Sequence, residues 1–139
     1  MHSSIPNCYA LRIIRKGNLE DDGSFVKLNI AGLYMDRARA LTRFHETEEA
    51  HEALDIARDN LGPELTRWQA RLLLADAHIY LAETDPDSCC EMALESLKVV
   101  RATQSQSNLK RVGNLYHQLK EQYPHRPKVN RLSLQLQQT

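Results

Sequence analysis

The chain has 139 residues, which is the length of one domain. Its apolar share of 42% and charged share of 26% are ordinary for a globular protein and exclude a disordered or fibrous chain, and no apolar run approaches the roughly 20 residues of a membrane span. The formal net charge of zero hides an asymmetry, because residues 1–97 carry ten Lys and Arg against seventeen Asp and Glu, and residues 98–139 carry eight against one.

Helix-forming residues dominate and β-branched runs are nearly absent, so we expect an all-α chain. A short helix is predicted over residues 6–16, with Gly17-Asn18 as its stop signal. Ser24 is expected to cap a long helix that reaches about Phe44. Thr47 is expected to begin the next helix with a pattern that resembles a capping box, and this helix ends near residue 60 before Gly62-Pro63.

The second half of the chain continues this helical pattern. A helix is predicted over residues 64–83, and Asp85-Pro86 has the form of an N-cap followed by proline at the first helical position. The helix that follows reaches about residue 103, and Ser107 or Asn108 can cap the one after it, which stops at Tyr123-Pro124. Residues 127–137 have apolar positions that fit either a helix or a strand, and the all-α neighbours favour a helix. Leu134 then lies off the main helical face, where it can contact another molecule.

Two stretches share one template of small and large residues. In each, small residues stand where two antiparallel helices must touch, and larger ones where the next unit packs. The first copy is Tyr34, Ala38, Leu41, Ala50, Leu54 and Ala57. The second is Leu73, Ala77, Tyr80, Cys89, Ala93 and Ser96, and a third begins with Leu109, Val112, Gly113 and Tyr116.

This template resembles the tetratricopeptide repeat, a helix–turn–helix unit of about 34 residues. The resemblance implies a tetratricopeptide-like α-solenoid of antiparallel helical hairpins with about two and a half repeats in one domain, 1–139. The repeats would be 24–60, 64–103 and a degenerate 107–137, and residues 1–18 would be the remnant helix of a preceding repeat. The chain departs from the family in its step of 39 residues from Ala50 to Cys89, and in having Ala38 and Ala77 where the family has glycine.

A second resemblance concerns context. The segments Arg37–Phe44 and Glu48–Arg58, followed by Tyr123-Pro124-His125-Arg126-Pro127, look like the C-terminal repeat regions of bacterial helix–turn–helix transcriptional regulators. This implies a non-enzymatic protein or peptide interaction module that serves as the ligand-sensing or dimerisation region of such a regulator. Nothing in the chain resembles the DNA-binding domain itself.

The repeat pattern also assigns residues to a concave binding face, because the first helix of each repeat lines that face in such solenoids. The residues are Met35, Arg39, Arg43, Arg71, His78, Lys110, Asn114 and His117. Such cationic donors can bind a carboxylate of a protein or peptide partner by charge-assisted hydrogen bonds, and Lys110 with Asn114 resembles the pair of carboxylate-clamping repeats. The alternative is a solvated face whose charges pair within the molecule.

No motif of an enzyme is present, and we expect no catalytic residue, no cofactor and no metal. Cys8, Cys89 and Cys90 form no CxxC, which indicates reduced thiols in a cytoplasmic protein. The segment Met1-His2-Ser3-Ser4 does not have the pattern of a signal peptide.

The basic C-terminal third leaves an alternative function open. Cationic and aromatic residues alternate there and can track phosphates, which would make the chain a nucleic-acid-associated helical domain. The residues are Arg101, Lys110, Arg111, Tyr116, Lys120, Tyr123, Arg126, Lys128 and Arg131. Because the domain is neutral overall and has no known nucleic-acid motif, we favour a protein or peptide partner, or a homodimer through an exposed terminal face.

Overall fold

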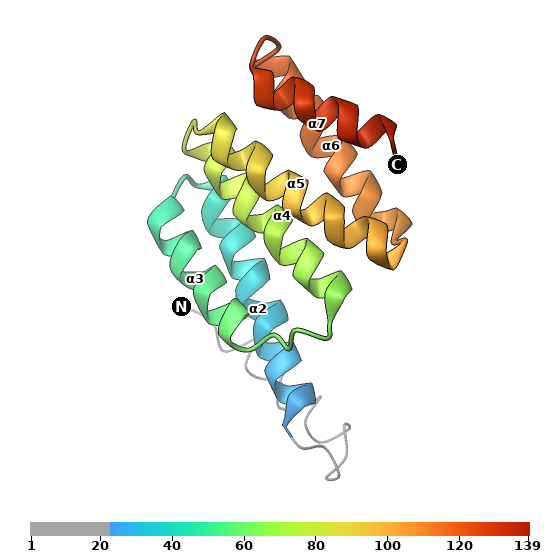
Figure 1. Cartoon of the computed structure of the whole chain (residues 1–139). Helices are drawn as coiled ribbons and strands as arrows, with labels where there is room; N and C mark the ends of the chain where they lie inside the picture. The colour runs from blue at the N-terminus through green and yellow to red at the C-terminus, as the bar shows by residue number, and fades with distance from the viewer. Residues whose placement is uncertain (1–22) are drawn as a thin grey trace.

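The structure is a computed structural model, and its residues 23–139 are described here. This part of the chain is all α-helical, as predicted, and contains no strand. Figure 1 shows its six helices, which are α2 (Ser24–Arg43), α3 (Thr47–Asp59), α4 (Thr66–Ala82), α5 (Pro86–Thr103), α6 (Gln106–Gln122) and α7 (Pro127–Gln137). The last segment is a helix, so its strand alternative was wrong. The helix predicted over residues 6–16, and Cys8, lie outside the described residues.

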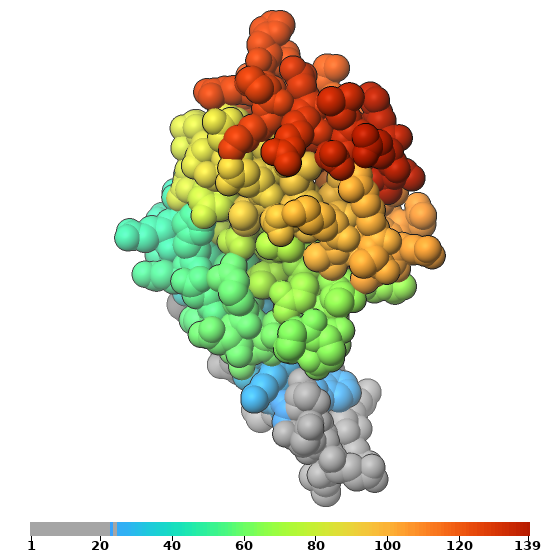
Figure 2. Space-filling view, in the orientation of Figure 1, coloured from blue at the N-terminus to red at the C-terminus, as the bar shows by residue number. Residues whose placement is uncertain are grey.

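The helices pack in two sets. α2 contacts α3 and α4 contacts α5 along their lengths, and α4, α6 and α7 also contact the helical pair that precedes their own. α4 contacts α2 and α3, and α6 contacts α4 and α5, whereas α3 and α5 do not touch. We call α2, α4 and α6 the inner helices, and α3 and α5 the outer helices. α7 packs on α5 and α6 at the C-terminal end, and Figure 2 shows the helices succeeding one another from that end to the N-terminal one.

The apolar core has two parts that meet at α4. One part lies between α2, α3 and α4, and the other lies among α4, α5, α6 and α7. α4 serves both because Leu72 and Ile79 point into the first part, whereas Leu74 and Ala77 point into the second. The template positions of the outer helices are all fully buried, as expected for helix contacts: Ala50, Leu54, Ala57, Cys89, Ala93 and Ser96.

The turns after α2 and α4 have the same backbone geometry. His45 and Thr84 stand 39 residues apart and adopt left-handed φ angles of 60° and 59°. In each turn the following residue donates its N–H over 2.9 Å to the carbonyl five residues earlier, Glu46 to Leu41 and Asp85 to Tyr80. This is the Schellman pattern of helix termination. The 39-residue repeat of the sequence template is therefore also present in the backbone conformation of these two turns.

The third hairpin departs from the first two. None of residues 123–126 between α6 and α7 has a positive φ. The template placed Gly113 at a close helix contact, but a Cβ atom added there would meet nothing within 4 Å. That prediction was wrong, because the buried residues of α6 are Asn108, Val112, Leu115 and Leu119, which turn Gly113 away from its neighbours.

The predicted helix caps were right at one of four starts. Asp85 caps α5 by accepting the Ser88 N–H over 3.1 Å. Gly23, with φ 96°, takes the N-cap position that was assigned to Ser24. α3 begins at Thr47, as predicted, but no side chain caps it. α4 begins at Thr66, two residues later than expected.

The cap of α6 is Ser105, which accepts the Asn108 N–H over 3.3 Å. The predicted caps, Ser107 and Asn108, lie inside the helix, because the polar linker before it is shorter than the sequence indicated. None of the six described helices is long and apolar enough to cross a bilayer.

Candidate functional site

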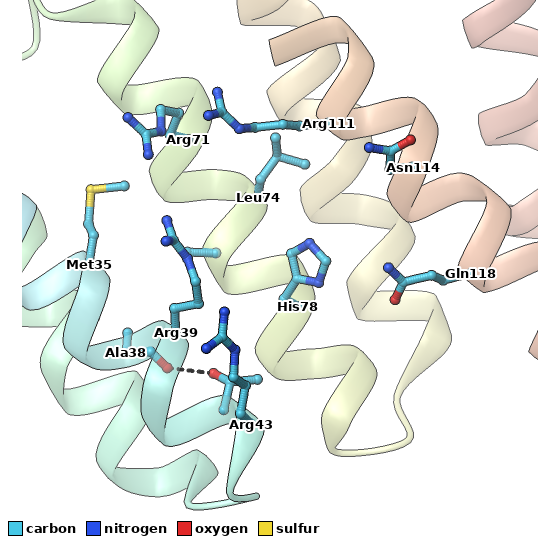
Figure 3. Close-up of a pocket in the computed structure, with 12 residues that line it drawn as sticks. Met35, Ala38, Arg39, Arg43, Arg71, Leu74, His78, Arg111, Asn114 and Gln118 are labelled. Atoms are coloured by element: carbon cyan, nitrogen blue, oxygen red, sulfur yellow. Dashed lines mark hydrogen bonds between the residues drawn. The ribbon is translucent and has the colours of Figure 1, made fainter. Parts of the chain in front are cut away.

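A groove of about 620 Å³ runs across the inner helices. Every one of its lining residues comes from α2, α4 or α6, and Figure 3 shows their side chains converging on one space. They are Met35, Ala38, Arg39, Thr42, Arg43, Arg71, Leu74, Ala75, His78, Arg111, Asn114 and Gln118. The contact of each inner helix with the next therefore produces one continuous surface from helices that are distant in the sequence.

Six of the eight predicted face residues line this groove: Met35, Arg39, Arg43, Arg71, His78 and Asn114. Lys110 and His117 do not, and both are exposed elsewhere on α6. The sequence missed Arg111 and Gln118, which take part instead. Successive residues differ by about 100° around a helix, so Arg111 and Gln118 face the groove in place of their neighbours Lys110 and His117, whereas Asn114 faces it as predicted. The spacing of Val112, Leu115 and Leu119 carried the correct register.

The groove is cationic and has no carboxylate among its lining residues. Arg39, Arg43, Arg71 and Arg111 contribute four guanidinium groups. Arg39 lies 3.6 Å from Asp36, which is a contact between two exposed side chains. No ion pair within residues 23–139 includes Arg43, Arg71 or Arg111. The predicted alternative of a face neutralised by its own ion pairs therefore does not describe these three arginines.

Arg71 is held in the groove by an aromatic ring. Its Cζ atom lies 4.9 Å from the centroid of the Trp68 ring, a cation–π contact that fixes the guanidinium without neutralising it. Partial burial lowers the pKa of Arg71, the positive charges of Arg111 and Arg39 lower it further, and the carboxylate of Asp36 opposes this lowering. These three arginines therefore feel one another, and a negative charge placed among them would be favourable.

Arg111 is held by an amide. Its Nη1 donates to Asn108 Oδ1 over 3.0 Å, and Asn108 Nδ2 donates to the carbonyl of Arg67 over 3.2 Å. Asn108 is only 1% exposed, so this bridge between α6 and α4 is part of the packed interior. It directs the Arg111 side chain from α6 across toward Arg71, as Figure 3 shows.

His78 adds a neutral polar group to the groove. Solvent reaches the ring, but the surrounding walls remove much of its hydration, and this desolvation lowers the pKa of His78. The positive charge of Arg39 lowers it further. At neutral pH the imidazole is thus uncharged, with one nitrogen that donates and one that accepts a hydrogen bond.

Several charges on the outer side of the molecule are paired. Arg58 donates to Asp55 over 2.7 Å and to Asp76 over 2.6 Å. Burial raises the pKa of Asp76, and Arg58 opposes that rise. His51 lies 3.2 Å from Glu83. These contacts join α3 to α4 and its following turn.

The basic C-terminal third is also partly neutralised by α5. Arg126 lies 3.9 Å from Asp87, and Lys128 pairs with Glu91. Arg101 donates to the carbonyl of Gln135. These contacts between α5 and the C-terminal segment occupy cations that a nucleic-acid surface would need.

The two described thiols are unsuited to chemistry. Cys89 and Cys90 are fully buried, and this burial raises their pKa values to about 12 and about 11. A thiol that stays protonated is a poor nucleophile and a poor metal ligand. Within residues 23–139 no three His, Cys, Asp or Glu side chains are placed to hold a metal ion together.

Comparison of the chain with protein-family models, with curated proteins and with solved structures found no match.

Proposed function

We propose that this protein is a non-enzymatic binding module whose groove takes an acidic segment of a protein or peptide. The observation that carries the proposal is the set of four arginines in a groove without a lining carboxylate. Guanidinium groups form strong, directional hydrogen bonds with carboxylates, and Asn114 and Gln118 add neutral donors and acceptors beside them. A peptide with Asp, Glu or a free C-terminus fits this chemistry.

We further infer that the helices form a tetratricopeptide-like solenoid of two hairpins and a degenerate third. Two features support this inference: the repeated turns at His45 and Thr84, and the way in which α4 and α6 each contact both helices of the preceding pair. In a solenoid each unit contacts only its neighbours, and an extended face is left for a partner. The groove across the inner helices has the position of such a face.

The wider role that we propose is that of a cytoplasmic ligand-sensing or dimerisation region of a bacterial transcriptional regulator. It is carried by the sequence resemblance given above. Leu134 on α7 is 58% exposed and offers an apolar contact to a second copy of the chain. Light scattering across a concentration range tests self-association, and a monomer at every concentration would argue against the dimer.

Two charge reversals on different faces test the groove. Arg39→Glu places a carboxylate in the groove, whereas Lys110→Glu makes the same change of net charge outside it. The probe is a panel of fluorescein-labelled peptides that differ in Asp and Glu content and in a free or amidated C-terminus, measured by fluorescence anisotropy. We expect Arg39→Glu to weaken acidic peptides by about tenfold or more, and Lys110→Glu to leave them nearly unchanged.

The comparison of Arg39→Glu with Lys110→Glu distinguishes binding at the groove from non-specific electrostatic attraction. Equal losses in the two variants would show that net charge alone draws the peptides, and full binding by Arg39→Glu would remove the groove from the proposal. Circular dichroism of both variants shows whether each is folded.

A further inference from the structure

Arg71 and Arg111 belong to two cavities at once. Besides the groove, they line a smaller cavity of about 270 Å³ at the start of α6, together with Arg67, Trp68 and two serines, Ser105 and Ser107. The two guanidinium groups thus stand where the cavities meet, between α4 and α6. Figure 3 shows Arg111 extended toward Arg71 at this end of the groove.

Both arginines are positioned by neutral partners that leave their charges uncompensated. Trp68 supports Arg71 through its ring face, and Asn108 supports Arg111 through its amide oxygen. Neither arginine has an ion pair within the described residues. The positive charge of Arg111 lowers the pKa of Arg71, so an anion bound between the two guanidinium groups would relieve their mutual repulsion.

The remaining groups at this junction are hydrogen-bond donors without negative charge. Ser105 is 6% exposed, and its Oγ lies 3.5 Å from Ser107 Oγ, so the two hydroxyl groups are close together in the cavity wall. One carboxylate would neutralise only one of the two guanidinium groups. A phosphoryl group has about two negative charges and three acceptor oxygens, which can engage both guanidinium groups and a hydroxyl together.

We propose that Arg71 and Arg111 form an anchor for a dianionic phosphoryl group. The group is either a phosphorylated side chain of the segment in the groove or free phosphate. The first source rests on the proposed function, because the rest of the segment would lie along the groove. The anchor itself is testable without any peptide.

Trp68 reports on this site directly. It is the single tryptophan of the chain, and Arg71 lies over its ring. The experiment titrates the protein with inorganic phosphate at mildly alkaline pH and constant ionic strength, follows Trp68 emission, and repeats the titration with acetate as a monoanion. We expect a saturable change with phosphate and none with acetate. Equal responses to both anions would overturn the proposal.

Three variants locate the binding. Arg111→Gln should weaken phosphate by about tenfold or more, and Arg37→Gln, which removes an exposed arginine outside both cavities, should leave it unchanged. Asn114→Asp gives Arg111 a carboxylate one helical turn away without removing an arginine, and should also weaken phosphate binding. Phosphate binding that survives both Arg111→Gln and Asn114→Asp would refute the anchor.

A second experiment, with peptides, distinguishes a phosphorylated side chain from free phosphate as the source of the phosphoryl group. One peptide of the anisotropy panel is made with serine, glutamate or phosphoserine at a single position. Tighter binding of the phosphoserine form, lost in Arg111→Gln, identifies a phosphorylated segment, whereas binding of inorganic phosphate without that gain identifies the free anion. Acidic peptides that bind while phosphate has no effect would retain the proposed function and reject the phosphoryl anchor.

Discussion

The inner and outer helices use charge in opposite ways. α2, α4 and α6 together carry nine Lys and Arg against three Asp and Glu, whereas α3 and α5 carry three against eight. On the outer side Arg58 is bonded to two carboxylates, and Lys98 lies 3.1 Å from Glu95. On the inner side three groove arginines have no ion pair among the described residues. Ion pairs within the fold thus engage Arg58 on α3 and the three carboxylates of α5, whereas three inner arginines have no such pair in the described part of the chain and are available to a ligand.

This difference separates two physical roles that the net charge of zero conceals. A paired charge that is partly buried contributes to stability, and removing one partner leaves the other desolvated and alone. An unpaired cation on a hydrated groove contributes little to stability and remains open to an anion. Substitutions on the two sides should therefore change different measured quantities.

The largest effect on stability is expected from Arg58→Met on the outer side. Asp76 has a side chain that is 11% exposed, and without Arg58 it would be an ionised carboxylate with no cation beside it. Because Arg58 itself is 45% exposed, we expect a loss of about 2 kcal/mol in the free energy of unfolding at neutral pH, rather than the larger cost of a fully buried pair. Urea unfolding followed by circular dichroism measures it.

The pH dependence of that loss has a definite sign. Burial holds the pKa of Asp76 above its ordinary value, and removing Arg58 raises it further. As pH falls through this raised pKa the folded state takes up a proton before the unfolded state does, so the deficit of Arg58→Met should shrink in mild acid. The inner control, Arg43→Met, should change stability by no more than about 0.5 kcal/mol. Equal losses of stability in Arg58→Met and Arg43→Met would contradict the difference drawn between paired outer charges and unpaired inner ones.

Sequence periodicity predicted much of the fold and most of the groove. The spacing of Ala50, Leu54 and Ala57, and of their counterparts 39 residues later, predicted buried helix contacts, because only small residues allow two helices to approach closely. The helix boundaries came from strong punctuation such as Asp85-Pro86. Arg39, Arg43 and Arg71 were placed correctly because α2 and α4 follow the template closely.

The errors arose where tertiary contacts decide the outcome. The register of α6 depends on Asn108, a polar residue that is buried because it bonds to the Arg67 carbonyl, and such a residue reads as a surface or cap position in a sequence. Arg111 and Gln118 line the groove in place of the predicted Lys110 and His117, whereas Asn114 lines it as predicted. Pairing between α5 and α7 was equally hidden, since Lys128 and Glu91 are 37 residues apart.

The second-largest effect on stability is expected at the turn between α4 and α5, which joins an inner helix to an outer one. Thr84 has φ 59°, a left-handed conformation that a β-branched residue adopts at a cost and glycine adopts freely. We expect Thr84→Gly to raise the free energy of unfolding by about 1 kcal/mol after the entropy of glycine is counted. Thermal and urea unfolding measure the change.

The matching turn supplies a replicate and a control. His45→Gly, at φ 60°, should be stabilising to a similar extent, whereas Phe44→Gly, at the neighbouring exposed position with φ −95°, should be destabilising. A gain at only one of His45 and Thr84 would show that the two hairpins are less alike than their backbone geometry indicates.

Gly113→Ala gives a smaller effect and tests the third hairpin. If α6 repeated the helix contact of the template, an added methyl group would clash with a neighbouring helix and destabilise the protein. In this structure the methyl group would meet nothing within 4 Å, so only the better helix propensity of alanine remains. We expect a gain of roughly 0.7 kcal/mol in the free energy of unfolding. A loss of stability would instead indicate that Gly113 makes the close helix contact that the sequence template predicted.

The smallest expected effect is on the pH dependence of peptide binding in the groove, and it depends on the protonation of His78. Desolvation and Arg39 hold its pKa below the ordinary value, so the free groove contains a neutral imidazole at neutral pH. An acidic segment bound beside it would raise that pKa, and binding would then take up a proton, while the carboxylates of the peptide stay ionised. Affinity for an acidic peptide should therefore rise as pH falls below neutrality, by about threefold if the pKa rises by half a unit on binding.

His78→Gln should remove this rise, because glutamine keeps hydrogen-bonding groups and does not titrate. His117→Gln, on the exposed side of α6 and outside the groove, should retain it. Anisotropy titrations of both variants across the same pH range measure the difference. If the increase in affinity at low pH survives His78→Gln and is lost in His117→Gln, the peptide binds on the other side of α6. The unpaired arginines of the groove would then not be explained by the binding of this acidic peptide.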